Sequence, residues 1–309
     1  MSSRSSSARS IRAAVPSSAR EPIAQRAPEA EVVAIDDLPN LDEIDFLVPV
    51  SHRQGELVDR LPGLGRLAVI QTLSAGVDAL EGQVPPSITL CSARGARDSA
   101  VAEWVLGALL GSTTRIAEMA RRRRWDEDRG LDDLRDSTVL IVGMGSIGRR
   151  VAELVEAFGA CPVGVVSAAR DDLHGIDELP ALLGDAHSVV LLTPLTEATH
   201  HLIDAQALAR MRDGTLLVNA ARGPVVDTEA LLAETASGRL RAVLDVIDPE
   251  PLPDGHPLWD APGVLSITPH IAGNSPLANL RAAELAGDQL ARFCAGRPLL
   301  NVVQEGHRS

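Results

Sequence analysis

The fold is decided by Val139-Leu140-Ile141-Val142-Gly143-Met144-Gly145-Ser146-Ile147-Gly148, which runs directly into a helix-forming segment, Arg149 to Phe158. Four apolar residues before a GxGxxG pattern predict a strand, a tight turn and a helix. The first glycine permits the turn, the second lets a pyrophosphate approach the backbone, and the third lets the helix pack against the strand. Free amides at the helix start face the phosphates. The predicted phosphate-binding positions are Gly143, Gly145, Ser146, Ile147 and Gly148.

A GxGxxG pattern by itself also occurs in unrelated glycine turns. Here the apolar strand before it and the helix after it supply the context that dinucleotide binding requires. The position of the motif matters too, because a large part of the chain precedes it and must form a separate structure. We therefore expect a dinucleotide-binding domain in the middle of the chain.

Composition excludes several classes of protein. With 309 residues, of which 45% are hydrophobic, the chain is long enough to bury two domain cores. The net charge of −13 argues against a nucleic-acid-binding surface, and we expect the basic run Arg121 to Arg124 to cap a helix or form ion pairs. The longest apolar run, Val101 to Leu110, is interrupted by Glu103, so we expect no membrane span.

The cysteines are Cys91, Cys161 and Cys294, an odd number without metal-ligand spacing, so the sequence predicts unpaired thiols, no metal site and a cytoplasmic location. We expect residues 1–10, rich in Ser and Arg, to form a disordered leader. The chain contains neither lysine nor tyrosine, which excludes Schiff-base chemistry and the Tyr-Lys pair of short-chain dehydrogenases. Arginine must therefore supply every fixed positive side-chain charge.

Short apolar runs alternate with helical segments on both sides of the glycine motif. Such alternation is typical of parallel sheets with helical crossovers, so we expect an α/β protein with two Rossmann-like, doubly wound parallel sheets. Helices are expected near residues 20–26 and 55–61, at 98–121 and at 277–293. Besides 139–142, strands are expected at 11–15, 31–35, 46–50, 67–70, 162–166, 188–192, 215–219, 242–246 and 264–267.

Three polar residues follow separate predicted strands in the second half of the chain: Arg222, Glu250 and His270. Ligands of open parallel sheets bind beyond the carboxyl ends of the strands, so these side chains can converge on one edge. Histidine can deliver a proton near neutral pH, a carboxylate can orient its ring, and arginine can grip a carboxylate through two hydrogen bonds. Each residue could instead be an ordinary loop or ion-pair residue. As a set behind a dinucleotide motif, they indicate reduction of a 2-oxo acid.

Together these motifs resemble the D-isomer-specific 2-hydroxyacid dehydrogenase family over Ile11 to Val303. Several independent stretches match in the family's order. They are the glycine motif, Ser74-Ala75-Gly76-Val77-Asp78, Ala100-Val101-Ala102-Glu103-Trp104, Leu192-Thr193-Pro194-Leu195-Thr196, Val218-Asn219-Ala220-Ala221-Arg222-Gly223, Leu244-Asp245-Val246 and Pro269-His270-Ile271-Ala272-Gly273.

The resemblance implies a role for each matching residue. His270 is the acid/base, Glu250 its partner and Arg222 the substrate clamp. The backbone amides of Ala75 and Gly76 hold the substrate carboxylate in a cleft between two domains, although an ordinary turn would explain them too. The cofactor positions implied are Thr193 and Pro194 on the adenosine side, Ala220 and Ala221, and Asp245 at the nicotinamide carboxamide or its ribose, where a helix cap is the alternative.

The resemblance also implies a topology and an oligomeric state. A dinucleotide-binding domain, residues 99–273, is inserted in a flavodoxin-like substrate (catalytic) domain formed by residues 11–98 and 274–309. The segment from Asp98 to Trp125 resembles the family's dimerisation region, so we expect a homodimer. The expected small-molecule partner is a small 2-oxo or 2-hydroxy acid, and His52 and Arg53 are candidates for selecting its side chain.

The chain departs from the NAD-binding pattern at one position. NAD sites place an acid at the end of the second strand, roughly 20 residues after the glycines, to bind the ribose hydroxyls. Here the strand ends Val165-Val166-Ser167-Ala168-Ala169-Arg170, and the acids Asp171 and Asp172 come later. Ser167 and Arg170 can hold a 2′-phosphate that a carboxylate would repel, so the sequence favours NADP(H) over NAD(H). A dual-specific enzyme is the alternative.

The expected activity is therefore hydride transfer between NAD(P)H and a small 2-oxo acid, with glyoxylate and hydroxypyruvate as examples. Formate dehydrogenases pair the histidine with glutamine, and phosphite-oxidising relatives use a lysine, so this chain fits neither. The alternative from another class is a non-catalytic, NAD(H)-sensing protein similar to the corepressors that share the fold.

Overall fold

The computed structural model describes residues 10–35, 41–50, 57–116, 118, 119, 125 and 131–307. The chain divides into two compact units, which we describe separately: unit 1 is Met1–Arg97 with Ser275–Ser309, and unit 2 is Asp98–Asn274. Residues 1–9 of the expected leader, His52, Arg53 and the run Arg121 to Arg124 lie outside the described residues. Among the described residues, no helix is long and apolar enough to cross a membrane.

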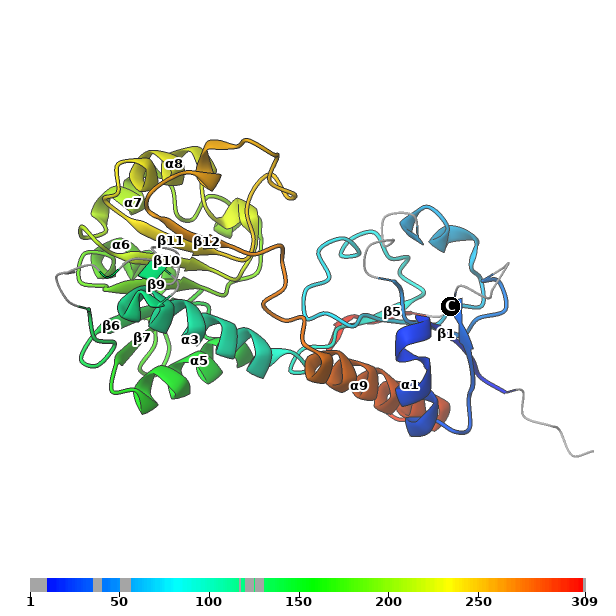
Figure 1. Cartoon of the computed structure of the whole chain (residues 1–309). Helices are drawn as coiled ribbons and strands as arrows, with labels where there is room; N and C mark the ends of the chain where they lie inside the picture. Colours follow the sequence, from blue (N-terminus) through cyan, green and yellow to red (C-terminus); the bar gives the residue numbers. More distant parts are fainter. Residues whose placement is uncertain are drawn as a thin grey trace, which may run out of the picture. The chain divides into compact units, whose positions relative to one another are not determined.

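Unit 2 is built on a seven-stranded, wholly parallel sheet in the order β12-β11-β10-β9-β6-β7-β8 (Figure 1). Numbered from the glycine-motif strand, this is the Rossmann order 3-2-1-4-5-6 with one further strand. The strands are β6 (Thr138–Val142), β7 (Cys161–Val166), β8 (His174–Gly175), β9 (Ser188–Leu191), β10 (Leu216–Asn219), β11 (Arg241–Leu244) and β12 (Val264–Ile267).

Helices cover both faces of this sheet, as Figure 1 shows. They are α3 (Asp98–Thr114) and α5 (Ser146–Ala157) on one face, and α6 (Leu179–Leu182), α7 (Ala205–Arg210) and α8 (Thr228–Ala236) on the other. Successive residues of β6 point to opposite faces of the sheet, and each face has its own hydrophobic core. Val139 and Ile141 pack with α3 and α5, whereas Leu140 and Val142 pack with the other helices. Both faces of the strand are buried, which explains its unbroken apolar sequence.

Unit 1 contains a six-stranded sheet in the order β13-β5-β4-β3-β1-β2. The order 2-1-3-4-5 of its parallel strands is that of flavodoxin-like folds. One face is covered by α1 (Arg20–Arg26) and α9 (Pro276–Cys294), which lie side by side (Figure 1). The strands are β1 (Arg12–Val15), β2 (Glu31–Ala34), β3 (Phe46–Leu47), β4 (Val69–Gln71), β5 (Thr89–Cys91) and β13 (Val302–Gln304).

Gly287 is the residue that lets α9 lie against α1. A Cβ atom built on it would lie 2.6 Å from the Cβ of Arg26 and 3.1 Å from the Cα of Ile23. Arg26 then crosses to α9, where its guanidinium is 2.9 Å from the carboxylate of Glu284 and 3.4 Å from that of Asp288. The last helix thus returns the chain to the first sheet.

The predicted fold class is confirmed, with corrections at the level of single elements. β5, β8 and the antiparallel edge strand β13 were not among the predicted strands. The predicted strand 46–50 keeps only Phe46–Leu47, since Pro49 cannot donate a ladder hydrogen bond. Part of the expected helix 55–61 lies outside the described residues.

The helix expected at 98–121 ends earlier, at Thr114. The hydroxyls of Thr113 and Thr114 both donate to the carbonyl of Leu110, at 3.1 and 2.6 Å, in competition with the helical amides. The next residue, Arg115, has a φ of 52°, a left-handed conformation that stops an α-helix. Ile116, Glu118 and Met119 are helical again, so the apolar periodicity predicted the helical segment but not the break at Arg115.

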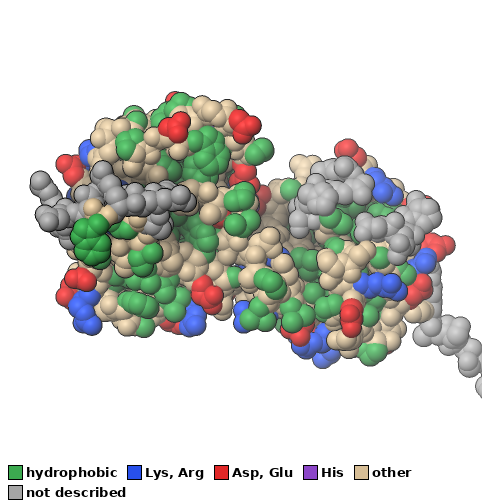
Figure 2. Space-filling view, viewed as in Figure 1, with side chains coloured by type: hydrophobic (Ala, Val, Ile, Leu, Met, Phe, Trp, Pro, Cys, Tyr) green, Lys and Arg blue, Asp and Glu red, His purple; other side chains and the backbone are tan. Residues whose placement is uncertain are grey.

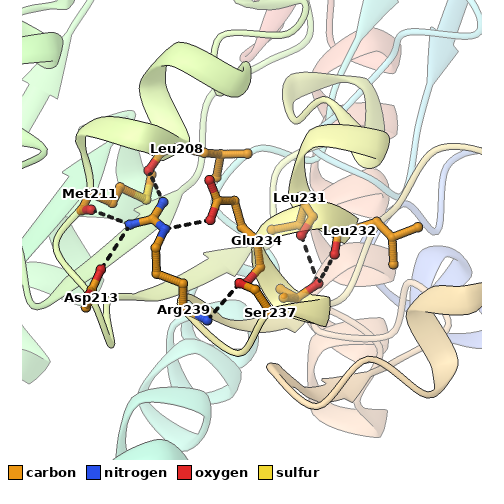
Figure 3. A network of polar contacts seen from close by, with 9 residues as sticks. Leu208, Met211, Asp213, Leu231, Leu232, Glu234, Ser237 and Arg239 are labelled. Atoms are coloured by element: carbon orange, nitrogen blue, oxygen red, sulfur yellow. Dashed lines mark hydrogen bonds and ion pairs between the residues drawn. The ribbon is translucent and has the colours of Figure 1, made fainter.

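Arg239 ties together α7 and α8 on one face of unit 2 (Figure 3). Its guanidinium donates to the carbonyls of Leu208 and Met211 at the end of α7, both at 2.8 Å, and to the Glu234 carboxylate of α8 at 2.6 Å. The Glu234 hydrogen bond, the largest influence, raises the pKa of Arg239 and keeps it charged. In a chain without lysine, this arginine supplies the positive charge at a helix C-terminus.

Candidate active site

The strands of unit 2 end in one row. Hydrogen-bonded register places Val165, Val142, Leu191, Asn219, Leu244 and Ile267 side by side across β7, β6, β9, β10, β11 and β12. The candidate residues of this unit follow that row: Gly143, Ser167, Thr193, Ala220, Asp245 and, a few residues further along each loop, Arg222, Glu250 and His270. The site therefore lies along the carboxyl edge of the sheet. It includes the point between β6 and β9 from which the strand order runs in opposite directions.

The glycine turn is held against both neighbouring strands. Gly143 donates its amide to the carbonyl of Val165, at 2.9 Å, and has a φ of +109°, a conformation that favours glycine. A Cβ atom there would lie 2.6 Å from the carbonyl carbon of Leu192. A Cβ on Gly148 would overlap the carbonyl oxygen of Gly143. Both glycines are required by the packing of the protein itself.

Gly145 is different, because a Cβ atom there would meet no protein atom within 4 Å. It caps the start of α5 with extended backbone, φ −74° and ψ −158°, which other residues adopt as well. Amides in the first turn of a helix have no acceptor within the helix, so those of Ser146, Ile147 and Gly148 can donate to a ligand. A glycine without a packing reason, next to these donors, fits the close approach of a dinucleotide pyrophosphate.

A pair of alanine substitutions separates the two kinds of glycine. Gly145→Ala should fold normally but bind NADPH at least roughly 10-fold more weakly, about 1.4 kcal/mol, because the methyl group occupies the ligand's space. Gly143→Ala should destabilise unit 2 by about 3 kcal/mol or more through overlap with the Leu192 backbone. Thermal unfolding and NADPH fluorescence titration measure the two effects. Unchanged NADPH binding by folded Gly145→Ala would contradict the assigned phosphate site.

The end of β7 lies beside the glycine turn through the bond between Gly143 and Val165. Ser167 and Arg170 follow it and are both exposed. Arg170 and Leu173 exchange two backbone hydrogen bonds, of 3.1 and 2.9 Å, across a tight turn in which Asp171 has a φ of 51°. The segment that the sequence singled out for cofactor preference is therefore a short exposed loop next to the phosphate-binding turn.

The loop after β9 passes on the other side of the turn. The amide of Leu192 donates to the carbonyl of Val142 at 2.8 Å, which holds the loop against β6. Thr193 is buried and donates its hydroxyl to the carbonyl of Pro194 at 2.8 Å, and Thr199 donates to the same carbonyl at 2.7 Å. Thr193 and Pro194 are thus rigidly held beside Gly143.

His270 and Glu250 meet although they follow different strands. The Nδ1 atom of His270, after β12, lies 2.8 Å from Oε1 of Glu250, after β11, and each side chain is about half exposed, 50% and 44%. A carboxylate can only accept, so the ring proton resides on Nδ1 when the imidazole is neutral. This leaves Nε2 as the ring nitrogen that can exchange a proton with a ligand.

Arg222 is half-buried in the loop after β10, and its guanidinium donates to the carbonyl of Ala221 at 2.6 Å. The buried Asn219 shapes this loop: its amide nitrogen donates to the carbonyls of Arg222 and Val246, at 3.1 and 3.5 Å, and its oxygen accepts from Ala221 at 3.1 Å. A Cβ on Gly223 would overlap the carbonyl oxygen of Ile247. The loops after β10 and β11 are therefore locked to each other.

Ala75 and Gly76 lie in unit 1, in a loop whose carbonyls are held by side chains. The carbonyl of Ser74 accepts from the Thr72 hydroxyl at 2.8 Å, and that of Gly76 accepts from the Ser74 hydroxyl at 2.7 Å. Arg97 donates its Nε–H to the carbonyl of Leu73 at 2.9 Å, and burial lowers the pKa of its guanidinium. Because the C=O and N–H of a trans peptide point in opposite directions, the bound Ser74 carbonyl directs the Ala75 amide to the other side of the loop.

Two residues that shape these loops, Asn219 and Arg97, were not among the predicted site residues. The sequence does contain a signal for Asn219, which is a polar residue at the end of an apolar strand. Such a side chain needs hydrogen-bond partners when it is buried. Arg97 stands in an arginine-containing loop segment, Ala93-Arg94-Gly95-Ala96-Arg97, with nothing local to show that it contacts Leu73.

Comparison with known proteins identifies the class. Residues 104–272 match the family model of the D-isomer specific 2-hydroxyacid dehydrogenase, NAD binding domain. A glyoxylate reductase of Thermofilum pendens is 34% identical over 78% of this chain and 75% of its own length. A glyoxylate/hydroxypyruvate reductase B of Citrobacter koseri is 32% identical, with 80% of each chain covered.

The solved structures agree with the sequence relatives. An NADPH-dependent glyoxylate/hydroxypyruvate reductase of Sinorhizobium meliloti, crystallised with NADP and sulfate, superimposes with a TM-score of 0.82 at 28% identity, covering 95% of this chain and 98% of its own. The chain belongs to the D-isomer specific 2-hydroxyacid dehydrogenase family. The predicted family is confirmed.

Proposed function

We propose that this chain is an NADPH-dependent reductase that converts a small 2-oxo acid into the D-2-hydroxy acid, with glyoxylate and hydroxypyruvate as the first substrates to test. The observation that carries the proposal is the His270–Glu250 pair, 2.8 Å apart, beyond the same row of strand ends as the glycine turn. The names of the relatives, which are reductases of these two acids, support the substrate class.

Each residue of the site has a chemical task. Reduced nicotinamide, when bound, supplies the hydride that reduces the carbonyl carbon of the substrate. Arg222 binds the substrate carboxylate and polarises the carbonyl, and His270 gives the Nε2 proton to the carbonyl oxygen as it becomes a hydroxyl. Glu250 accepts the Nδ1–H and stabilises the imidazolium before the proton leaves. In the oxidative direction His270 takes the proton back.

The remaining assignments follow from this scheme. Unit 2 is the dinucleotide-binding domain, in which Gly143, Gly145, Ser146, Ile147, Gly148, Thr193, Pro194, Ala220 and Ala221 contact the cofactor. Unit 1 is the substrate domain, whose Ala75 and Gly76 amides bind the substrate carboxylate. Cys91, Cys161 and Cys294 are unpaired, and Cys161 is exposed, which favours a reducing compartment such as the cytoplasm.

We also propose a homodimer formed through α3. Asp98 and Glu103 are the charged residues of this 17-residue helix, and Trp104, Leu106 and Leu110 lie outside its fully buried face. Ile116, just beyond it, is 69% exposed. Figure 2 shows hydrophobic side chains at the surface in the region of α3 and α5. Such a surface suits a second copy of the chain, and sedimentation equilibrium measures the mass in solution.

A spectrophotometric screen of 2-oxo acids with NADPH and NADH tests the proposed reaction. We expect turnover of at least one short 2-oxo acid and production of the D isomer. A wild-type protein that binds the dinucleotide but turns over none of these acids would favour the dinucleotide-sensing alternative.

Cofactor preference is expected to depend on Ser167. The wild type should use NADPH with higher kcat/KM than NADH, and Ser167→Asp should lower the NADPH value by roughly 100-fold, about 3 kcal/mol, through repulsion of the 2′-phosphate. The kcat/KM for NADH should change little in this variant, because the ribose hydroxyls of NADH can donate to the new carboxylate. Arg170→Gln serves as the second variant. It should lower kcat/KM for NADPH and leave kcat/KM for NADH unchanged. A wild type that clearly prefers NADH would overturn this proposal.

A further inference from the structure

Asp245 makes an unusual set of hydrogen bonds within unit 2. It is only 4% exposed, and its carboxylate accepts from Thr268 Oγ1 at 2.6 Å, from the Ile271 amide at 2.8 Å and from the Ala272 amide at 2.9 Å. All three donors belong to the loop that follows β12 and carries His270. A carboxylate offers about four acceptor positions, so three are already used within the protein.

The backbone of Asp245 holds the same loop. Its carbonyl accepts from the His270 amide at 2.8 Å. The Ile271 amide, which binds the Asp245 carboxylate, belongs to the peptide bond on the other side of His270. Asp245 therefore binds both peptide groups that flank His270, and with them it sets the backbone torsions that aim the imidazole.

His270 needs this support because its φ is +53°. A non-glycine residue adopts the left-handed conformation at a cost of about 1–2 kcal/mol, so the loop would relax if it were not held. Relaxation would turn the Cα–Cβ bond and separate Nδ1 from Glu250, which lies on a different loop. The bonds of Asp245 thus preserve the contact with Glu250 that orients the ring.

We propose that Asp245 is a positioning residue that acts through the loop of residues 268–272 to hold His270 against Glu250. The proposal differs from the cofactor contact that the family resemblance implies for Asp245. It rests on the proposed acid/base function of His270.

The test compares variants that remove the loop bonds singly. In Asp245→Asn the side-chain amide opposes the Ala272 amide, donor against donor, so kcat for 2-oxo acid reduction should fall by roughly 10- to 100-fold at saturating cofactor and substrate. Thr268→Val removes one donor and should lower kcat by about 3- to 10-fold, whereas Thr268→Ser restores it. Asp227→Asn is the matched control, because Asp227 accepts a backbone amide of α8 at 3.0 Å and asparagine caps helices equally well.

Two readouts separate positioning from cofactor binding. The Kd for NADPH, from fluorescence titration, should stay within about 3-fold of wild type in Asp245→Asn and Thr268→Val. The NMR chemical shifts of the His270 ring, recorded at one fixed pH, should change in both variants and stay unchanged in Asp227→Asn. The proposal would be overturned in favour of a cofactor contact if Asp245→Asn raised the Kd for NADPH strongly with kcat preserved, and Thr268→Val changed neither kcat nor the His270 ring signals.

The NMR chemical shifts of the His270 ring also keep the test independent of the reaction. If the wild type turns over no 2-oxo acid, the proposed function fails, but changed chemical shifts of the His270 ring in Thr268→Val still support positioning by this loop. If Asp245→Asn does not fold, the Thr268 pair decides the outcome. Unchanged chemical shifts of the His270 ring in folded Thr268→Val and Asp245→Asn would contradict the proposal, whatever activity these variants have.

Discussion

Replacing His270 by asparagine is expected to lower kcat/KM for 2-oxo acid reduction by roughly 10²- to 10⁴-fold, the range for loss of a general acid. Asparagine is preferable to alanine as the first variant, because it tolerates the left-handed backbone that His270 adopts at φ +53°. Cofactor affinity should change little, since the imidazole is assigned to the proton and not to the dinucleotide. Stopped-flow measurement of NADPH oxidation gives the rate, and fluorescence titration gives the affinity.

A second histidine–carboxylate pair provides the control for this experiment. Nδ1 of His174, in the edge strand β8, lies 2.9 Å from Oε2 of Glu178, close to the 2.8 Å that separates His270 and Glu250. His174→Ala should leave kcat at saturating cofactor within about 2-fold of wild type, because His174 lies in β8 and not in the loops after β11 and β12 that carry the proposed acid/base pair. The rate of Glu250→Gln should lie between those of His270→Asn and His174→Ala, since glutamine keeps a hydrogen-bond acceptor but not the negative charge.

The pH dependence of the rate provides an independent check. Reduction consumes a proton, which His270 is proposed to deliver, so the wild-type rate should fall as pH rises, and His270→Asn should remove that dependence. Unchanged turnover in folded His270→Asn would remove the proposed mechanism.

Replacing Arg239 by methionine is expected to destabilise unit 2 by about 3 kcal/mol. The methionine keeps the apolar stem but leaves the carbonyls of Leu208 and Met211 and the Glu234 carboxylate without their shared donor (Figure 3). The Arg239 side chain is only 25% exposed, so water replaces these bonds poorly. For a unit of this size the loss corresponds to a fall in Tm of roughly 6–12 °C, measurable by calorimetry.

The exposed pair formed by Arg150 and Glu153 supplies the control for Arg239. Its ion pair is short, 2.7 Å, but the two side chains are 48% and 63% exposed. Arg150→Met should therefore change stability by no more than about 0.5 kcal/mol. Equal effects of the two arginine substitutions would mean that the helix-capping network contributes no more than a surface ion pair.

Much of the fold could be read from local patterns. The central strands β6, β9 and β10 are largely buried on both faces, so each is a short, mostly apolar run, and this signal needs no tertiary information. The signal failed where an element is short or at an edge. β13 has two of its three residues exposed, Val302 and Val303, and pairs with a strand more than two hundred positions earlier in the chain. The early end of α3 depended on two threonine hydroxyls that periodicity does not register.

For the candidate site, local sequence patterns were sufficient to predict which residue types follow which strands. Gly143 was predicted from the glycine motif, and Ser167 from the missing acid after the second strand. Arg222, Glu250 and His270 were predicted because parallel strands bring their carboxyl ends to one edge. Which of these residues touch became clear from the folded structure alone. The Glu250–His270 contact spans 20 positions, and the three bonds from Asp245 to the His270 loop span 23 to 27. Hydrogen bonds depend on distance and direction in space, which a linear pattern of apolar and polar residues does not encode.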